Sequence, residues 1–91
     1  IYLAGRMRKI GSVEIDLSET NTLGRVILAN GGLSEFADGP RVRVIRRTPG
    51  ADALQTLIID LDEILQKGRI DKDLALQDGD FVIADAKLVN W

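Results

Sequence analysis

The stretch TLGRVILANGGLSEFADGPRVRVIRR, from Thr22 to Arg47, changes its hydrophobic period halfway and therefore predicts two different elements. Four residues in its first part follow the i, i+3, i+4, i+7 spacing of one helix face: Leu23, Val26, Ile27 and Asn30. Asn21 or Thr22 is placed to cap the start of this helix. Gly31 and Gly32 end it, because glycine adopts the left-handed backbone of a helix C-terminus without a Cβ penalty. A phosphate-binding loop is disfavoured here, since its glycines would precede a helix.

The second part, PRVRVIRR over residues 40–47, predicts a strand because its two valines alternate with other residues. Arg46 is expected to share a face with Val42 and Val44. The opposite face is expected to carry four side chains: Arg41, Arg43, Ile45 and Arg47. A turn over residues 48–52 then leads into ALQTLIID (53–60), which is expected to pair antiparallel with this strand.

Three further strands are expected near the two ends of the chain. IYLAGRM (1–7) and SVEIDL (12–17) are predicted to form an opening hairpin, whose loop ends at Gly11. In the second of them, apolar and acidic residues alternate, which is typical of a half-buried strand. Residues 81–85 form the last predicted strand, after a tight turn centred on Gly79.

A short second helix is predicted over residues 61–67. Asp60 and Glu63 have the spacing of a capping box at its start, and Gly68 follows its end. The predicted order is therefore β-β-α-β-β-(short α)-β. This order indicates an α+β domain of the β-grasp (ubiquitin-like roll) type, with one main helix packed on a mixed sheet. The other sheet face would then meet water or a partner.

The composition is that of one small domain covering residues 1–91, with 45% hydrophobic residues and only 4% aromatic ones. No apolar run reaches the roughly 18 residues of a membrane span. Histidine and cysteine are both absent, which removes the commonest general base, disulfides and cysteine-ligated metals. Because the chain starts inside an apolar run, we expect it to be a piece of a longer protein.

The net charge of −2 conceals an uneven distribution along the chain. Residues 1–47 carry eight Lys and Arg against five Asp and Glu, whereas residues 48–91 carry four against nine. Chance segregation in a small domain explains this as readily as function does. The alternative is a two-signed surface that packs head-to-tail against copies of itself.

Paired carboxylates are the nearest approach to catalytic chemistry: Asp60, Asp62 and Glu63; Asp71 and Asp73; Asp78 and Asp80. A glycosidase needs two carboxylates across a cleft, one with a raised pKa. These acids instead occupy a predicted cap, loop and turn, where solvated carboxylates are common. Calcium binding by the later four is also disfavoured, since their spacing fits no EF-hand loop. We therefore predict no enzyme activity, no metal and no cofactor.

The arginines of residues 41–47 are the remaining functional signal. They could form an ordinary solvated face, or a charged edge that resists aggregation. A nucleic-acid surface is disfavoured by the pI near 5.0 and the few aromatic residues. The third interpretation is an interface, in which Arg41, Arg43 and Arg47 meet carboxylates of a neighbouring domain or an acidic glycan. Ile45 among them favours this third interpretation, because a solvated face does not need it.

Four blocks of the sequence resemble the soluble-ligand-binding β-grasp (SLBB) domain of bacterial polysaccharide biosynthesis/export proteins, of the outer-membrane capsule and exopolysaccharide translocon type. They are IYLAGRMRKIGSVEI, TLGRVILANGGLSEFADGPRVRVIRR, LIIDLDEILQKG and DLALQDGDFVIADAKLVNW. The resemblance spans essentially the whole chain. Its most specific parts are GGLSEFA with RVRVIR, DGDFVI and the closing KLVNW.

This resemblance implies a structural and assembly role in a polysaccharide export channel in the periplasm and outer membrane of a Gram-negative bacterium. The implied partners are neighbouring SLBB domains in a homo-oligomer, the polysaccharide in transit and, as a further candidate, an inner-membrane polysaccharide co-polymerase. A module that binds a soluble ligand or glycan is the alternative function.

Overall fold

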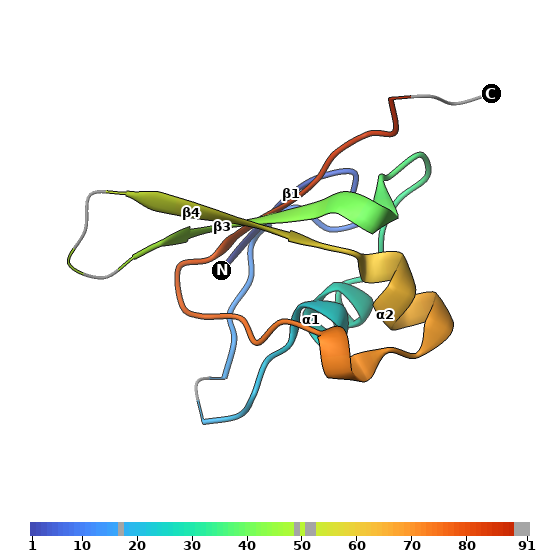
Figure 1. Ribbon diagram of the computed structural model, residues 1–91. Coiled ribbons are helices and arrows are strands. Elements are labelled where there is room, and N and C mark those ends of the chain that lie inside the picture. The colour runs from blue at the N-terminus through green and yellow to red at the C-terminus, as the bar shows by residue number, and fades with distance from the viewer. Residues whose placement is uncertain (17, 49, 51–52, 89–91) are drawn as a thin grey trace.

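The computed structural model describes residues 1–16, 18–48, 50 and 53–88 and confirms the predicted α+β fold (Figure 1). Its five strands are β1 (Tyr2–Gly5), β2 (Gly11–Ser12), β3 (Val42–Arg47), β4 (Leu54–Ile59) and β5 (Phe81–Ala84). Its helices are α1 (Leu23–Ala29) and α2 (Leu61–Lys67), with 3-10 turns η1 (Gly39–Arg41) and η2 (Ile70–Lys72). Among the described residues, no helix has the length and apolar character that crossing a membrane requires.

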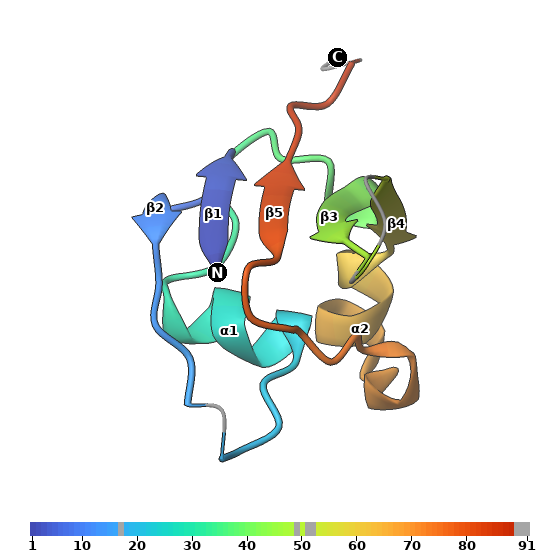
Figure 2. The same ribbon diagram turned by 90° about the vertical axis from the view of Figure 1, so that its left-hand side faces the viewer.

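The strands form one mixed sheet in the order β2-β1-β5-β3-β4 (Figure 2). The first and last strands of the chain, β1 and β5, lie side by side and parallel, whereas the other neighbours are antiparallel. Both helices lie on the same side of the sheet (Figures 1 and 2). This arrangement is β-grasp-like.

The core lies between the sheet and the two helices. Alternate residues of the strands point toward it, as the period of two requires. Its fully or nearly buried members include Leu3, Leu23, Val26, Ile27, Val42, Val44, Leu61, Ile64, Val82 and Ala84. The predicted apolar residues of α1 (Leu23, Val26 and Ile27) and of β3 (Val42 and Val44) are therefore confirmed as core residues.

The second predicted strand is much shorter than residues 12–17, since only Gly11–Ser12 pairs with β1. The expected alternation does persist beyond it: Val13 and Ile15 pack on the core, and the acids between them are exposed. At Asp16 the carboxylate accepts hydrogen bonds from the amide and hydroxyl of Ser18 (2.9 and 2.6 Å). Such a local turn competes with strand pairing. Leu17 lies outside the described residues.

Helix α1 starts at the predicted place, with Thr22 at the N-cap, but the predicted side-chain cap is wrong. Neither Thr22 nor Asn21 caps: the Thr22 hydroxyl is buried without a partner among the described residues, and the Asn21 amide bonds to carbonyl oxygens. Asp73 acts instead, accepting a hydrogen bond from the amide of Gly24 at 3.0 Å. A carboxylate from far along the chain thus satisfies an otherwise unpaired N–H of the first turn.

The second helix and its flanks follow the prediction, except that the Glu63 side chain pairs with Lys72 at 3.2 Å instead of completing the capping box. The Asp60 carboxylate accepts from the amide of Glu63 at 3.0 Å, and Gly68 ends α2 in the left-handed conformation. Strand β3 begins at Val42 rather than at residue 40, because Pro40 belongs to η1. The fixed φ of proline and its missing N–H suit the start of a 3-10 turn better than a strand interior. Arg41 therefore lies before the strand.

Gly31 ends helix α1 as predicted, with a φ of +96° and its amide directed to the carbonyl of Leu28. The other glycines assigned to turns or caps also have positive φ: Gly11, Gly32 and Gly79. We expect Gly31→Val to lower the free energy of unfolding by about 1 kcal/mol or more, because a side chain is disfavoured in this conformation. Its Cβ would also lie 3.2 Å from the Cβ of Arg8.

Thermal and urea unfolding of Gly31→Val would measure this loss, with Thr20→Val at an exposed position as the control. Equal stability of Gly31→Val and the parent would show that the helix end tolerates a side chain there.

Candidate interface on the uncovered sheet face

One face of the sheet packs against α1 and α2, and the opposite face is not covered by either helix (Figure 1). This uncovered face is here called the outer face. The register of β1, β3, β4 and β5 places ten side chains on it: Tyr2, Ala4, Arg43, Ile45, Arg47, Leu54, Thr56, Ile58, Phe81 and Ile83. Most of these are aliphatic or aromatic. The rings of Tyr2 and Phe81 stack with centroids 6.1 Å apart. An apolar surface of this extent on a small domain is typical of a protein or ligand contact.

Arg43 makes a two-pronged ion pair on the outer face. Its Nε donates to Oδ2 of Asp85 at 2.7 Å and its Nη2 donates to Oδ1 at 2.8 Å. These hydrogen bonds, and then the negative charge, raise the pKa of Arg43. The pair is half-exposed, so its remaining N–H groups and carboxylate lone pairs stay open to a partner.

A shallow hollow of about 450 Å³ lies beside this pair. Its walls come from Asp38, Arg41, Arg43, Ile58, Asp85, Ala86 and Leu88. Arg41 contributes a second ion pair, with Nε 3.2 Å from Oδ2 of Asp38. Ile58 and Leu88 are 56% and 97% exposed. The hollow therefore combines oriented charges with exposed aliphatic surface, which suits an anchoring side chain of a partner.

The four residues predicted for the interface are not equivalent. Arg43, Ile45 and Arg47 do share the outer face of β3, as expected from their alternation. Arg41 precedes the strand but lines the same hollow as Arg43. Arg43 already pairs with Asp85 of its own chain, so a partner would meet an ion pair rather than an unoccupied guanidinium.

Arg46 points inward and pairs with Asp80. Its Nε and Nη2 bond to the two carboxylate oxygens at 3.0 and 2.8 Å, and the amide of Gln77 donates to the same carboxylate at 2.9 Å. Asp80 is only 1% exposed, so its assignment to a solvated turn acid is wrong. Hydrogen bonding to Asp80 raises the pKa of Arg46. The inward position of Arg46 was predicted, but its buried partner was not.

These two ion pairs also bear on the uneven charge distribution. Arg43 and Arg46 come from the basic first half of the chain, and Asp85 and Asp80 come from the acidic second half. Part of the segregation is therefore used inside the domain to join β3 to the segment around β5.

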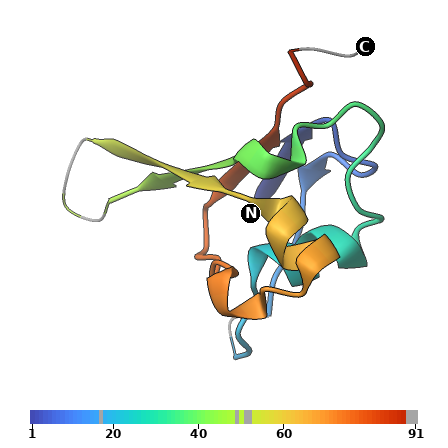
Figure 3. The same ribbon diagram turned by 45° about the vertical axis from the view of Figure 1, so that its right-hand side comes forward.

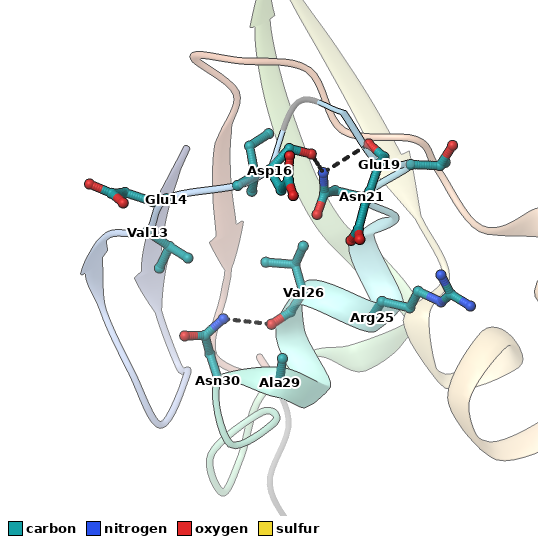
Figure 4. A pocket seen from close by; sticks show the side chains of 11 residues that line it. Val13, Glu14, Asp16, Glu19, Asn21, Arg25, Val26, Ala29 and Asn30 are labelled. Carbon is teal, nitrogen blue, oxygen red and sulfur yellow. Dashed lines mark hydrogen bonds between the residues drawn. The ribbon is translucent and has the colours of Figure 1, made fainter.

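A second hollow, of about 230 Å³, lies beside α1 (Figure 4). Its lining includes Asp16, Asn21 and Asn30. The amide of Asn21 donates to the carbonyls of Asp16 and Glu19 (2.7 and 3.2 Å), and that of Asn30 donates to Val26 (2.8 Å). Bonds from Ser18 lower the pKa of Asp16. These polar groups are therefore used to fix the conformation of the loop before α1 and of the end of α1. The volume of the hollow is also below the roughly 300 Å³ at which ligand pockets begin.

The paired carboxylates are dispersed. Asp73 caps α1, Asp80 is buried with Arg46, and Asp71 pairs with Arg69, which lowers the pKa of Asp71. Within the part of the chain that the structure describes, no group of three His, Cys, Asp or Glu residues is arranged to hold a metal ion.

A comparison with known family models finds no match, and a comparison with curated proteins finds none either.

Proposed function

We propose that this domain is a structural and assembly module of a bacterial polysaccharide export channel, and that its outer face meets a neighbouring domain. The resemblance of four sequence blocks to SLBB domains supports the export role, and the β-grasp-like fold agrees with it. The observation that carries the assembly role is the outer face itself, which joins exposed apolar side chains to the oriented pair of Arg43 and Asp85.

The chemistry of this face suits contact between proteins better than catalysis. Stacked Tyr2 and Phe81 offer rigid apolar area near its centre. Arg43 and Asp85 offer donors and acceptors at fixed positions, which select orientation and partner more than they add affinity. In the proposed channel, many such weak contacts around an oligomer act together.

Binding of a soluble ligand or glycan is the second candidate, favoured by the hollow next to Arg41 and Arg43. Titrating the chain with soluble fragments of an acidic polysaccharide would test it by NMR. Saturable shifts confined to the residues of that hollow would support capture. Unchanged spectra at millimolar fragment would leave assembly as the preferred function.

The Arg43–Asp85 pair allows a test by charge exchange. Arg43→Glu places two carboxylates next to each other. It is expected to abolish the ion pair, lower the thermal stability and impair oligomer assembly. Arg43→Glu with Asp85→Arg restores an internal pair of reversed sign, so we expect the thermal stability to return. Assembly and secretion by the parent exporter should stay impaired, because the partner now meets reversed charges.

The matched control is the same exchange at an exposed pair elsewhere, Arg69→Asp with Asp71→Arg. It should leave secretion unchanged and lower the stability only slightly, because the contact between Arg69 and Glu63 that it also removes is 3.8 Å long and near the surface. If the Arg43/Asp85 exchange fully restored secretion, the pair would be internal only and the outer face would not be the interface.

A further inference from the structure

Strand β4 forms one edge of the sheet and lacks the usual protection of an edge strand. Its six residues, LQTLII, contain no charge, proline or glycine. Leu54 and Ile58 are 59% and 56% exposed. The β3–β4 hairpin also extends beyond the helices, so they do not shield this part of its edge (Figures 1 and 3). Proteins normally blunt such edges with charge, bulges or proline, because an open edge is a template for another strand.

The hydrogen-bonding pattern determines which groups of β4 face the open edge. The amide of Tyr2, in β1, donates to the carbonyl of Asp80, and the amide of Arg6, just after β1, donates to the carbonyl of Ala84. The backbone N–H and C=O groups that residues 80, 82 and 84 use for pairing therefore point toward β1. Residues 81 and 83 then face β3 and pair with Ile45 and Arg43.

Backbone groups of successive residues point to opposite sides of β3 as well. Residues 42, 44 and 46 therefore form backbone hydrogen bonds with residues 59, 57 and 55 of β4, respectively. The bond from the amide of Thr48 to the carbonyl of Ala53, at 3.5 Å, fits the same phase. The three residues between them direct their N–H and C=O groups to the open edge: Leu54, Thr56 and Ile58.

We propose that β4 pairs antiparallel with β4 of a second copy of this chain, about a two-fold axis through Thr56. This inference rests on the sheet alone and not on the export role. In this register Thr56 lies opposite Thr56 of the partner subunit, and Leu54 lies opposite Ile58 of the partner subunit. All three positions have outward-directed backbone groups, so the pairing forms a continuous ladder of six hydrogen bonds.

The side chains also fit a second copy. A two-fold axis through Thr56 keeps outer-face residues on the outer face of both sheets, as the period of two requires. Leu54 then packs on an isoleucine and Thr56 on a threonine, which are favourable cross-strand pairs. Because residues 54–59 are uncharged, two copies do not repel each other along the paired edge. The opposite edge, β2, has only two residues and offers a much shorter ladder.

The expected association is weak, since a single strand pair buries less than the roughly 1,000 Å² of a stable interface. A dissociation constant on the order of 100 µM corresponds to about −5.5 kcal/mol. The dimer would therefore form at high local concentration and dissociate on dilution.

Charge complementation at Thr56 tests the pairing and its register together. We expect Thr56→Lys alone and Thr56→Glu alone to weaken self-association at least tenfold in sedimentation velocity, because like charges face each other across the axis. An equimolar mixture should recover or exceed the parent's association, since lysine then faces glutamate. The matched control is Gln55→Lys mixed with Gln55→Glu, where position 55 lies opposite Leu57 of the partner subunit and no specific recovery is expected.

Crosslinking gives a second measurement that needs no charge on the strand. The chain has no cysteine, so Thr56→Cys introduces a single thiol. In the proposed register the two Cα atoms lie about 5.5 Å apart, within disulfide range. Mild oxidation should crosslink Thr56→Cys much faster than Leu57→Cys, whose side chain points to the core. A parent chain that stays monomeric at millimolar concentration, a mixture no tighter than its components, or equal crosslinking at both positions would each overturn the proposal.

Discussion

Asp80→Asn is expected to lower the free energy of unfolding by about 3 kcal/mol or more, because removal of one member of a buried ion pair leaves the other charge uncompensated. Asp80 is 1% exposed, and the side chain of Arg46 is 14% exposed. The asparagine keeps the shape of the side chain but not its charge. For a domain of this size the loss corresponds to a fall in Tm of more than about 10 °C.

The matched control is Asp78→Asn, which makes the same chemical change at an exposed position of the same turn. It should change Tm little. The double variant Arg46→Met with Asp80→Asn should be less destabilised than the sum of the two single variants, since it leaves no unpaired guanidinium. Equal stability of Asp80→Asn and Asp78→Asn in urea unfolding would show that the pair contributes nothing measurable.

Gly5→Ala is expected to destabilise the domain by about 2 kcal/mol or more, through a positive φ combined with a collision with backbone. The φ of Gly5 is +82°, and a Cβ there would overlap the carbonyl oxygen of Ala84. That oxygen already accepts the amide of Arg6 at 2.7 Å, within the parallel pairing of β1 and β5. The backbone of Ala84 therefore cannot move away without loosening the centre of the sheet.

Gly11→Ala separates the two causes. Gly11 also has a positive φ, of +110°, but among the described residues no atom lies within 4 Å of a Cβ added there. It should show only the conformational cost of about 1 kcal/mol. If Gly5→Ala and Gly11→Ala lost equal stability, the close approach to Ala84 would be unimportant.

Local patterns predicted most of the fold because each signal lies within a few residues. The N-cap at Asp60, the helix end at Gly31 and the alternation of Val42 and Val44 all depend on neighbours in sequence. Interactions between distant segments were missed. Asp73 caps a helix that begins 50 residues earlier in the sequence, and no local signal separates it from a solvated acid.

The candidate interface shows the same limit. Alternation along β3 was sufficient to place Arg43, Ile45 and Arg47 on one face. The partner of Arg43 could not be predicted, because it depends on the register of β5 against β3. The open edge of β4 likewise depends on the strand order, which separates β4 from every strand except β3.

The parallel pairing of β1 with β5 has a consequence for how the domain is made. The first strand finds its main partner only after the intervening residues 6–80 have been synthesised. Until then β1 can pair only with β2, and an isolated two-stranded hairpin is at best marginally stable in water. The β3–β4 hairpin, whose strands are close in sequence, can form earlier on a microsecond timescale. Folding on the ribosome should therefore proceed from the middle of the chain outward, with the apolar first strand among the last parts to be buried.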